Sequence, residues 1–157
     1  MNTTKMNKVI LSAAVLAAIT GTALAGGVNN TITGQFGADA VGTQNTVTGS
    51  SAFTAGYNNN VSGNNAVSYG VSNKATGINS IAGGEYSYAK GRNSVAIGSS
   101  AQALQDNNFA IGSQARANGE DALAFGNGAY SENQATVAVG KSTRAKGLMG
   151  TAVGYGT

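Results

Sequence analysis

The chain has 157 residues with no Cys, His, Pro or Trp, while 24 residues are Gly and only 10% are charged. Without His or Cys, neither a Ser/His nor a Cys/His nucleophile system can be built, and the commonest metal ligand is missing. Two of the nine bases, Lys5 and Lys8, lie in a segment that we expect to be removed. Seven bases then face six acids, a net charge of +1. This excess is too small for a nucleic-acid-binding protein, so we expect no enzyme, no cofactor and no nucleic-acid partner.

Residues 1–25 have the layout of a secretory signal peptide. Lys5 and Lys8 form a basic start, Val9 to Ile19 is an almost unbroken apolar run, and Ala23-Leu24-Ala25 supplies small residues two apart. The apolar run is shorter than the roughly 20 residues that a membrane-spanning helix needs. We therefore predict an exported protein whose mature chain begins just after this segment. The alternative is an amphipathic or buried first helix.

Residues 26–37 read as a distorted first copy of the pattern that follows. Asn30 to Gly34 spells N-T-I-T-G and matches N-T-V-T-G at Asn45 to Gly49, but the step between the two is one longer than in the later repeats. Terminal units of repeat proteins are usually atypical and cap the stack. We therefore predict an N-terminal capping coil here.

Residues 38–157 repeat with a period of 14. The phrase S-V-A-I-G at residues 94–98 returns in variant form at each step, and its glycine keeps one register throughout. The glycines of this register are Gly42, Gly56, Gly70, Gly84, Gly98, Gly112, Gly126, Gly140 and Gly154. A fixed period of this kind marks a repeat architecture, because a flexible linker has no reason to keep register.

Each repeat is expected to contain two short strands. We number its positions 1 to 14 from residue 38, so that the register glycine lies at position 5. Positions 2 and 4 are mostly bulky and apolar, and position 3 is small, which predicts a strand that ends in a turn. A second short strand is expected over positions 8 to 11, and position 12 is again usually Gly. Two strands and two glycine-assisted turns close one coil of an all-β solenoid.

The alternation at positions 2 to 4 places the bulky and the small side chains on opposite faces. We expect the bulky side chains to fill the coil and the small ones to form a flat strip along the outside of the rod. So short a coil has room only for a thin core, and we therefore expect chains to associate along this strip. Its members include Ala96, Ala110, Ala124 and Ala138. The alternative is an alanine face that is merely exposed.

Positions 9 and 11 vary from repeat to repeat and form a candidate partner-binding face. Tyr88, Arg116, Tyr130 and Arg144 lie on this ribbon. Tyr and Arg are the residue types that most often anchor protein interfaces. The alternative is a solvated face that only keeps the protein soluble.

The acidic residues are not arranged for metal binding or catalysis. Glu120 and Asp121 are the only adjacent carboxylates, and neighbours on a strand point to opposite faces of a sheet. Glycine-rich solenoids that bind Ca²⁺ repeat an Asp in each nonapeptide, which this period does not provide. The Thr pair at Thr46 and Thr48 is not kept in later repeats, which disfavours an ice-binding face. We therefore expect no metal site.

The motif from Asn93 to Ala103, N-S-V-A-I-G-x-x-A-x-A, closely resembles the head repeat of trimeric autotransporter adhesins of the YadA type. Residues 108–119 and 136–147 carry the same pattern, and the resemblance covers residues 38–157, most strongly after Ser80. It implies a left-handed parallel β-roll that forms a homotrimer on a Gram-negative cell surface and attaches to host matrix proteins or cells. The alternative is a structural rod or spacer of a surface fibre or a phage tail fibre.

The sequence also departs from this family. Adhesins of this type carry a neck, a coiled-coil stalk and a membrane anchor after the head, and no heptad run or alternating membrane strand follows the repeats before Thr157. We therefore expect no membrane anchor within this chain. The chain would be either a truncated adhesin head or a secreted protein that uses the same repeat. We expect it to be exported, and either secreted or associated with the cell surface or outer membrane.

Overall fold

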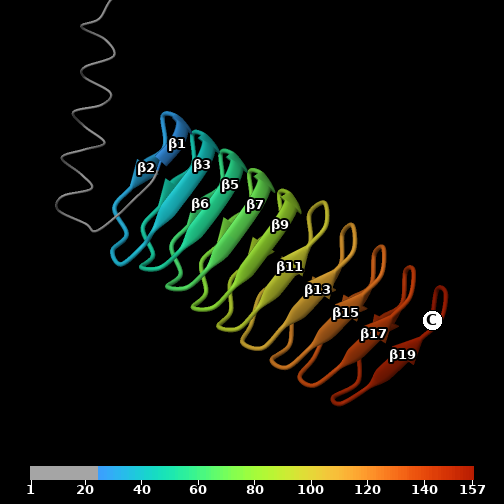
Figure 1. The fold of residues 1–157 in the computed structure, drawn as a ribbon. Coiled ribbons are helices and arrows are strands. Elements are labelled where there is room, and N and C mark those ends of the chain that lie inside the picture. Colours follow the sequence, from blue (N-terminus) through green and yellow to red (C-terminus); the bar gives the residue numbers. More distant parts are fainter. Residues whose placement is uncertain (1–24) are drawn as a thin grey trace, which may run out of the picture.

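A computed structural model describes residues 25–157 as a straight rod of stacked coils (Figure 1). The regular secondary structure of this range consists of β-strands alone. The range contains no helix long and apolar enough to cross a membrane. The predicted signal peptide lies outside the described residues, except for Ala25.

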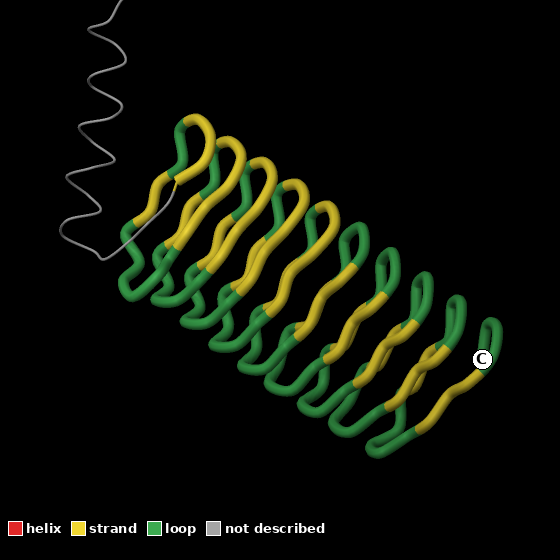
Figure 2. Tube along the Cα trace, in the orientation of Figure 1, coloured by secondary structure: helices red, strands yellow, loops and turns green. Residues whose placement is uncertain are grey.

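The strands form two parallel sheets that run the length of the rod (Figure 2). The ten-stranded sheet contains β1 (Ala25–Val28), β3 (Asp39–Thr43), β5 (Phe53–Tyr57), β7 (Val67–Val71), β9 (Ile81–Glu85), β11 (Val95–Ile97), β13 (Phe109–Ile111), β15 (Leu123–Phe125), β17 (Val137–Val139) and β19 (Thr151–Val153). The nine-stranded sheet contains β2 (Thr31–Ile32), β4 (Thr46–Val47), β6 (Asn60–Val61), β8 (Lys74–Ala75), β10 (Tyr88–Ala89), β12 (Gln102–Ala103), β14 (Arg116–Ala117), β16 (Tyr130–Ser131) and β18 (Arg144–Ala145). The chain alternates between the two sheets, so that one strand of the ten-stranded sheet and the next strand of the nine-stranded sheet make up one coil. The all-β parallel solenoid is confirmed.

The strand register shows that one sequence repeat forms one coil. Ala96 pairs with Ala110, and the same step separates the partners in each pair from β3 to β19. The first step is different, because Ala25 pairs with Ala40, which lies one position further along the chain than the common step would place it. The turn of this coil contains Phe36 and Gly37, both with positive φ, and the Phe36 side chain is exposed.

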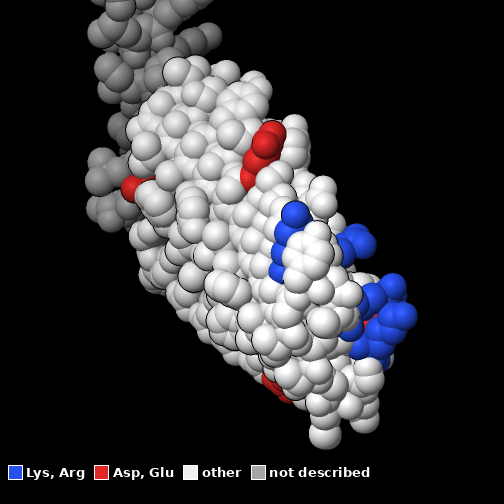
Figure 3. All heavy atoms as spheres, turned by 90° about the vertical axis from the view of Figure 1, so that its right-hand side faces the viewer, with Lys and Arg blue, Asp and Glu red and all other residues white. Residues whose placement is uncertain are grey.

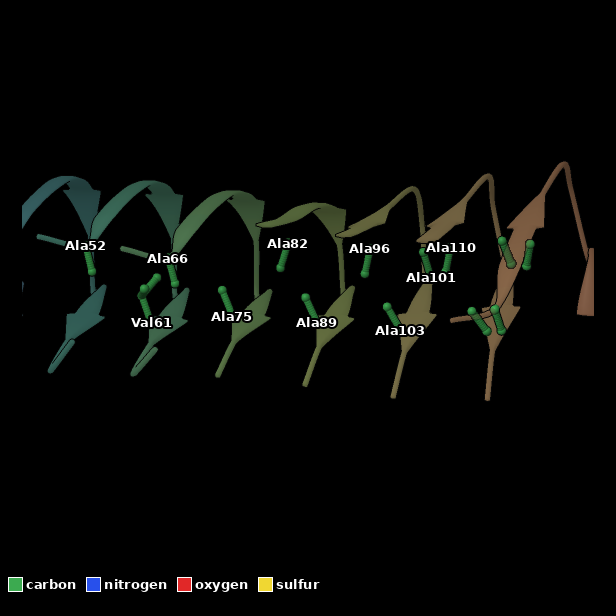
Figure 4. Close-up of a cluster of buried hydrophobic side chains, with 14 of the residues drawn as sticks. Ala52, Val61, Ala66, Ala75, Ala82, Ala89, Ala96, Ala101, Ala103 and Ala110 are labelled. Atoms are coloured by element: carbon green, nitrogen blue, oxygen red, sulfur yellow. The ribbon is translucent and has the colours of Figure 1, made fainter. Parts of the chain in front are cut away.

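The interior of the coil is lined by small side chains. Positions 1, 3, 8 and 10 point inward and carry Ala, Ser, Thr, Asn or Val, all buried as far as Ala145. In Figure 4, Ala82 and Ala96 of the ten-stranded sheet point toward Ala89 and Ala103 of the nine-stranded sheet. The predicted orientation of the first strand is therefore wrong: position 3 faces inward, and positions 2 and 4 face outward. Apart from Ile32 in the first coil, the largest buried apolar side chains are Val47 and Val61, so the interior is filled almost entirely by small residues.

The turns use the left-handed conformation at positions 7 and 14, so that it occurs twice in each coil. Asn58, Asn65 and Ser72 are examples, with φ of 55° at each. Asn and Asp adopt this conformation more readily than other residues that carry a Cβ. The position-12 glycines, which we expected to assist a turn through their conformational freedom, do not have positive φ. A Cβ at Gly63 would lie 1.9 Å from the backbone oxygen of Gly77, so glycine is required at position 12 because the backbones of successive coils approach closely.

Candidate interaction surfaces

The outward side of the ten-stranded sheet, which we call the apolar face, consists of positions 2 and 4. Its members include Val41, Phe53, Tyr69, Phe109, Phe125 and Val153, all exposed, and Val95, Ile97, Ile111, Leu123, Val137 and Val139, which are half-buried. The exposed fraction of Phe125 is 50%. Asp39, near the N-terminal end, is the only charged residue at these two positions between residues 38 and 157. The chain therefore keeps its bulkiest apolar side chains outside and its smallest inside.

An apolar face of this length is unusual on a soluble monomer. Large contiguous apolar patches on exposed surfaces usually mark protein–protein or membrane contacts. The side chains here also pack against one another along the rod. A Cβ at Gly83 would lie 2.2 Å from the Tyr69 ring, so this ring lies over the glycine of the next coil. The apolar face is thus a dense surface capable of packing against a similar one.

The alanines that we expected at a chain–chain interface do not lie on any surface. Ala96, Ala110, Ala124 and Ala138 are each 0% exposed in a single chain. Their methyl groups lie between the two sheets and cannot contact another molecule. The predicted interface is wrong for the same reason as the predicted strand orientation: alternation separates two faces but does not say which one is inside.

The candidate partner-binding face lies on the nine-stranded sheet, on the other side of the rod from the apolar face. Arg116, Tyr130 and Arg144 occupy position 9 on the successive strands β14, β16 and β18, and they stand in register. Tyr88 lies on β10 and is separated from Arg116 by Gln102 of β12. The structure therefore brings three of the four predicted residues together, with the fourth further along the same row. Their role in binding stays a prediction.

Hydrogen bonds and ring contacts hold this row in place. Arg116 Nε and Nη2 both donate to Gln102 Oε1, at 3.1 and 3.0 Å. The Arg144 guanidinium lies 5.0 Å from the centroid of the Tyr130 ring, and Arg144 Nη2 lies 3.0 Å from Glu132 Oε2. Asn118 Nδ2 donates to the Tyr130 hydroxyl at 2.8 Å. The aromatic ring and both guanidinium groups thus have partners that restrict their motion.

A groove of about 430 Å³ runs beside this row. It is lined by Ser100, Gln102, Gln114, Arg116, Gly128 and Tyr130. Three of these residues come from position 9 and three from position 7, so the groove lies between the sheet and a row of turns. We did not foresee Ser100, Gln102, Gln114 or Gly128 from the sequence. The signal that could have revealed them is the spacing, because positions 7 and 9 flank a buried residue at position 8 and therefore both face outward.

Basic side chains are confined to the part of the rod from Lys74 onward. Between residues 25 and 73 the chain has a single charged residue, Asp39, and every Lys and Arg of the described range lies at Lys74 or beyond. Figure 3 shows Lys and Arg gathered away from the N-terminal end. Among residues 25–157, no three acidic side chains cluster closely enough to hold a metal ion.

One comparison with known proteins agrees with this geometry. The family described as the YadA head domain repeat (2 copies) matches residues 62–87, 89–107 and 109–129. No curated protein is significantly similar to the chain. The resemblance noted in the sequence is therefore confirmed over residues 62–129, and the flanking coils keep the same register in the structure.

Proposed function

Because residues 62–129 carry YadA head domain repeats, we propose that the chain is a non-enzymatic adhesin head that works as a homotrimer at a bacterial surface. In this proposal the apolar face joins the three chains, and the nine-stranded sheet is presented outward to host matrix proteins or host cells. The repeats support an adhesin-like role, and the position of the bulky apolar side chains supports the assembly.

The apolar face is the observation that carries the proposal. Burial of apolar surface is the main favourable contribution to folding and association, and an interior of Ala, Ser and Asn buries little of it. The Val, Ile, Leu and Phe side chains of positions 2 and 4 remain exposed or half-buried in one chain. Packing these rows against other copies would bury them along the whole rod. A closed cyclic assembly uses the same face of every chain and leaves none open.

The oligomeric state of Ile111→Asp tests this assembly. Ile111 lies on β13 and points outward, so the variant chain can still fold, but in the trimer it would place three unpaired carboxylates in an apolar interface. Such charges are strongly unfavourable. By light scattering we expect three chains per particle for the parent and one for the variant.

Two further variants serve as controls. Ile111→Val keeps the apolar surface and should remain trimeric. Ala110→Glu puts a carboxylate inside the coil, where Ala110 is fully buried, and should unfold neighbouring coils rather than release folded monomers. A parent protein that stays a folded monomer at all concentrations would overturn the assembly and remove the main support for an adhesin head.

Attachment to host surfaces is tested separately with the assembled protein. We expect concentration-dependent binding to collagen, to fibronectin or to cultured cells, and weaker binding when Tyr88 and Arg144 are both replaced by Ala. A structural rod or spacer is the second candidate, since coils in one continuous register form a straight rod of regular pitch. An assembled protein that binds none of these surfaces would favour the spacer.

Export is part of the same proposal. The sequence layout of residues 1–25 supports cleavage after Ala25, and a surface or secreted location fits an adhesin. Intact mass of exported protein should show a chain that begins near Gly26. Exported chains that retain Met1 would contradict this.

A further inference from the structure

We propose that the groove between positions 7 and 9 binds one acidic sugar residue, a pyranose ring that bears a carboxylate. This inference builds on the proposed attachment to host surfaces, because it names the chemistry that the nine-stranded sheet recognises. The groove is lined by Ser100, Gln102, Gln114, Arg116, Gly128 and Tyr130. Its volume of about 430 Å³ lies within the range of small-ligand sites.

Arg116 supplies the positive charge. Among residues 25–157 its guanidinium makes no ion pair, and its recorded partner is the neutral Oε1 of Gln102. Arg144, in contrast, is paired with Glu132. The two bonds to Gln102 use Nε and Nη2 of Arg116 and fix the plane of the guanidinium. These bonds do not use Nη1 of the guanidinium, which can therefore donate to a carboxylate, the group whose geometry matches a guanidinium best.

Tyr130 supplies a flat apolar surface beside that charge. Its ring has the Arg144 guanidinium 5.0 Å from the centroid, and its hydroxyl accepts a hydrogen bond from Asn118, so the ring is held from two directions. Tyr130 pairs with Arg116 across β14 and β16, about 4.8 Å along the rod. A pyranose ring that lies on the aromatic face can therefore bring its carboxylate to the neighbouring guanidinium.

The opposite wall supplies hydrogen-bonding groups and open space. Ser100 and Gln114 carry a hydroxyl and an amide, which can each donate to and accept from sugar hydroxyls. Gly128 has no side chain, and a Cβ placed there would lie 3.7 Å from its nearest neighbour, Ser142 Oγ. A Cβ here would make ordinary van der Waals contact, and its absence leaves no side chain at this point on the wall of the groove opposite Tyr130.

The test is an NMR titration of the isotope-labelled, assembled full chain. Glucuronic acid and N-acetylneuraminic acid represent the two sources of the chemistry, glycosaminoglycans and sialylated glycans. Glucose and the methyl ester of glucuronic acid are the uncharged counterparts of glucuronic acid, and the methyl ester of N-acetylneuraminic acid is that of the second acid. We expect one of the acids to cause saturable chemical-shift changes around Arg116 and Tyr130, with a Kd on the order of 1 mM. The uncharged sugars should bind at least about tenfold more weakly. Equal binding of charged and uncharged sugars, or no binding of either acid, would overturn the inference.

Five variants test the individual roles. Arg116→Gln should weaken binding about tenfold, whereas Arg92→Gln removes the same charge on a distant turn and should change it by less than about twofold. Tyr130→Phe keeps the ring and should retain binding, which Tyr130→Ala should lose. Gly128→Asn fills the groove at a φ of 65°, close to that of the Asn and Ser residues in the same row, and should abolish binding while the fold survives. Equal losses for Arg116→Gln and Arg92→Gln would mean that only net charge matters, which would refute the site.

The sugar titration and the attachment assays can fail independently. A trimer that binds collagen or cells but no acidic sugar refutes the sugar site alone. A trimer that binds the sugar but attaches to no host surface refutes the proposed function and leaves the sugar site standing.

Discussion

The N-terminal half of the rod, from β1 to β9, and the C-terminal half, from β11 to β19, stabilise the same position of the coil in different ways. Position 8 carries Asn45, Asn59 and Asn73 in the N-terminal half and Ala101, Ala115 and Ala129 in the C-terminal half, all buried. The strands of the ten-stranded sheet from β3 to β9 are longer than those from β11 to β19. One register thus accommodates either an amide or a methyl group at position 8, and the polar Ser87 and Thr143 occupy the same position in the coils between and after these two sets.

In the N-terminal half, the buried asparagines form a continuous ladder. Asn59 Nδ2 donates to Asn45 Oδ1, to the Ala55 carbonyl at 3.2 Å and to the Gly70 carbonyl at 2.9 Å. Its own Oδ1 accepts from the backbone N–H and the side chain of Asn73. Buried polar groups are tolerated only when they are hydrogen-bonded, and this side chain has all its partners.

In the C-terminal half, the backbone makes the turn without such help. Ala115 N donates to the Gly112 carbonyl at 3.2 Å, and Gly112 N donates to the Ile97 carbonyl of the preceding coil at 2.8 Å. The alanine methyl group needs no partner. Backbone hydrogen bonds between coils therefore set the period in both halves, while position 8 decides how the turn after the first strand is completed.

The largest effect is expected from breaking the ladder with Asn59→Ala. The change removes a shared donor and acceptor from the middle of the stack, so buried partners on both sides lose hydrogen bonds. We expect the free energy of unfolding to fall by about 2 to 4 kcal/mol, measured by urea denaturation at one fixed chain concentration. Asn60→Ala, on the neighbouring exposed position, should change it by less than about 0.5 kcal/mol. Similar losses for the two variants would show that the ladder is not stabilising.

A smaller effect is expected where successive backbones approach most closely. Gly63→Ala would place a Cβ 1.9 Å from the Gly77 backbone oxygen, so the two coils must move apart, at a cost of about 1 to 3 kcal/mol. Gly147 occupies the same position in the last complete coil, and a Cβ there meets nothing within 4 Å. Thermal unfolding should therefore show a lower melting temperature for Gly63→Ala and little change for Gly147→Ala. Equal shifts would contradict a role in close approach.

The smallest effect is a gain in stability from Ala135→Asn. Ala135 has a φ of 54° at position 14, where Asn65, Asn79, Asn93 and Asn107 adopt the same conformation in earlier coils. Asn adopts the left-handed region more easily than Ala, so this change should stabilise the C-terminal half by about 0.5 to 1 kcal/mol. Asn93→Ala should cost more than this, because it also removes the side-chain hydrogen bonds of Asn93 with Asn79 and Asn107. A decrease in melting temperature for Ala135→Asn would contradict this assignment.

The sequence was sufficient to predict the period, the two strands of each coil and the resemblance to YadA head repeats. Each rests on a pattern that repeats along the chain, so that a departure at a single residue, such as Gln105 in place of glycine at position 12, does not matter. The side of the sheet that Ala110 and Ile111 face could not be read from alternation alone, because the same alternation fits either orientation of the strand. The groove was missed for another reason: Ser100 and Gln114 line one groove only because successive coils stack, and neither residue belongs to a motif.

The direction of the hydrogen bonds between coils has a mechanical consequence for a protein held at one end. These bonds run along the axis of the rod, since every strand pairs with the strand one coil away. Tension along the axis therefore loads the bonds of the terminal coil directly, and coils should detach one at a time. A detached coil extends to roughly 46–50 Å from a folded height of about 4.8 Å. Each released coil would thus lengthen about tenfold. Under tension the rod could therefore extend in steps before its attachment to a bound surface breaks.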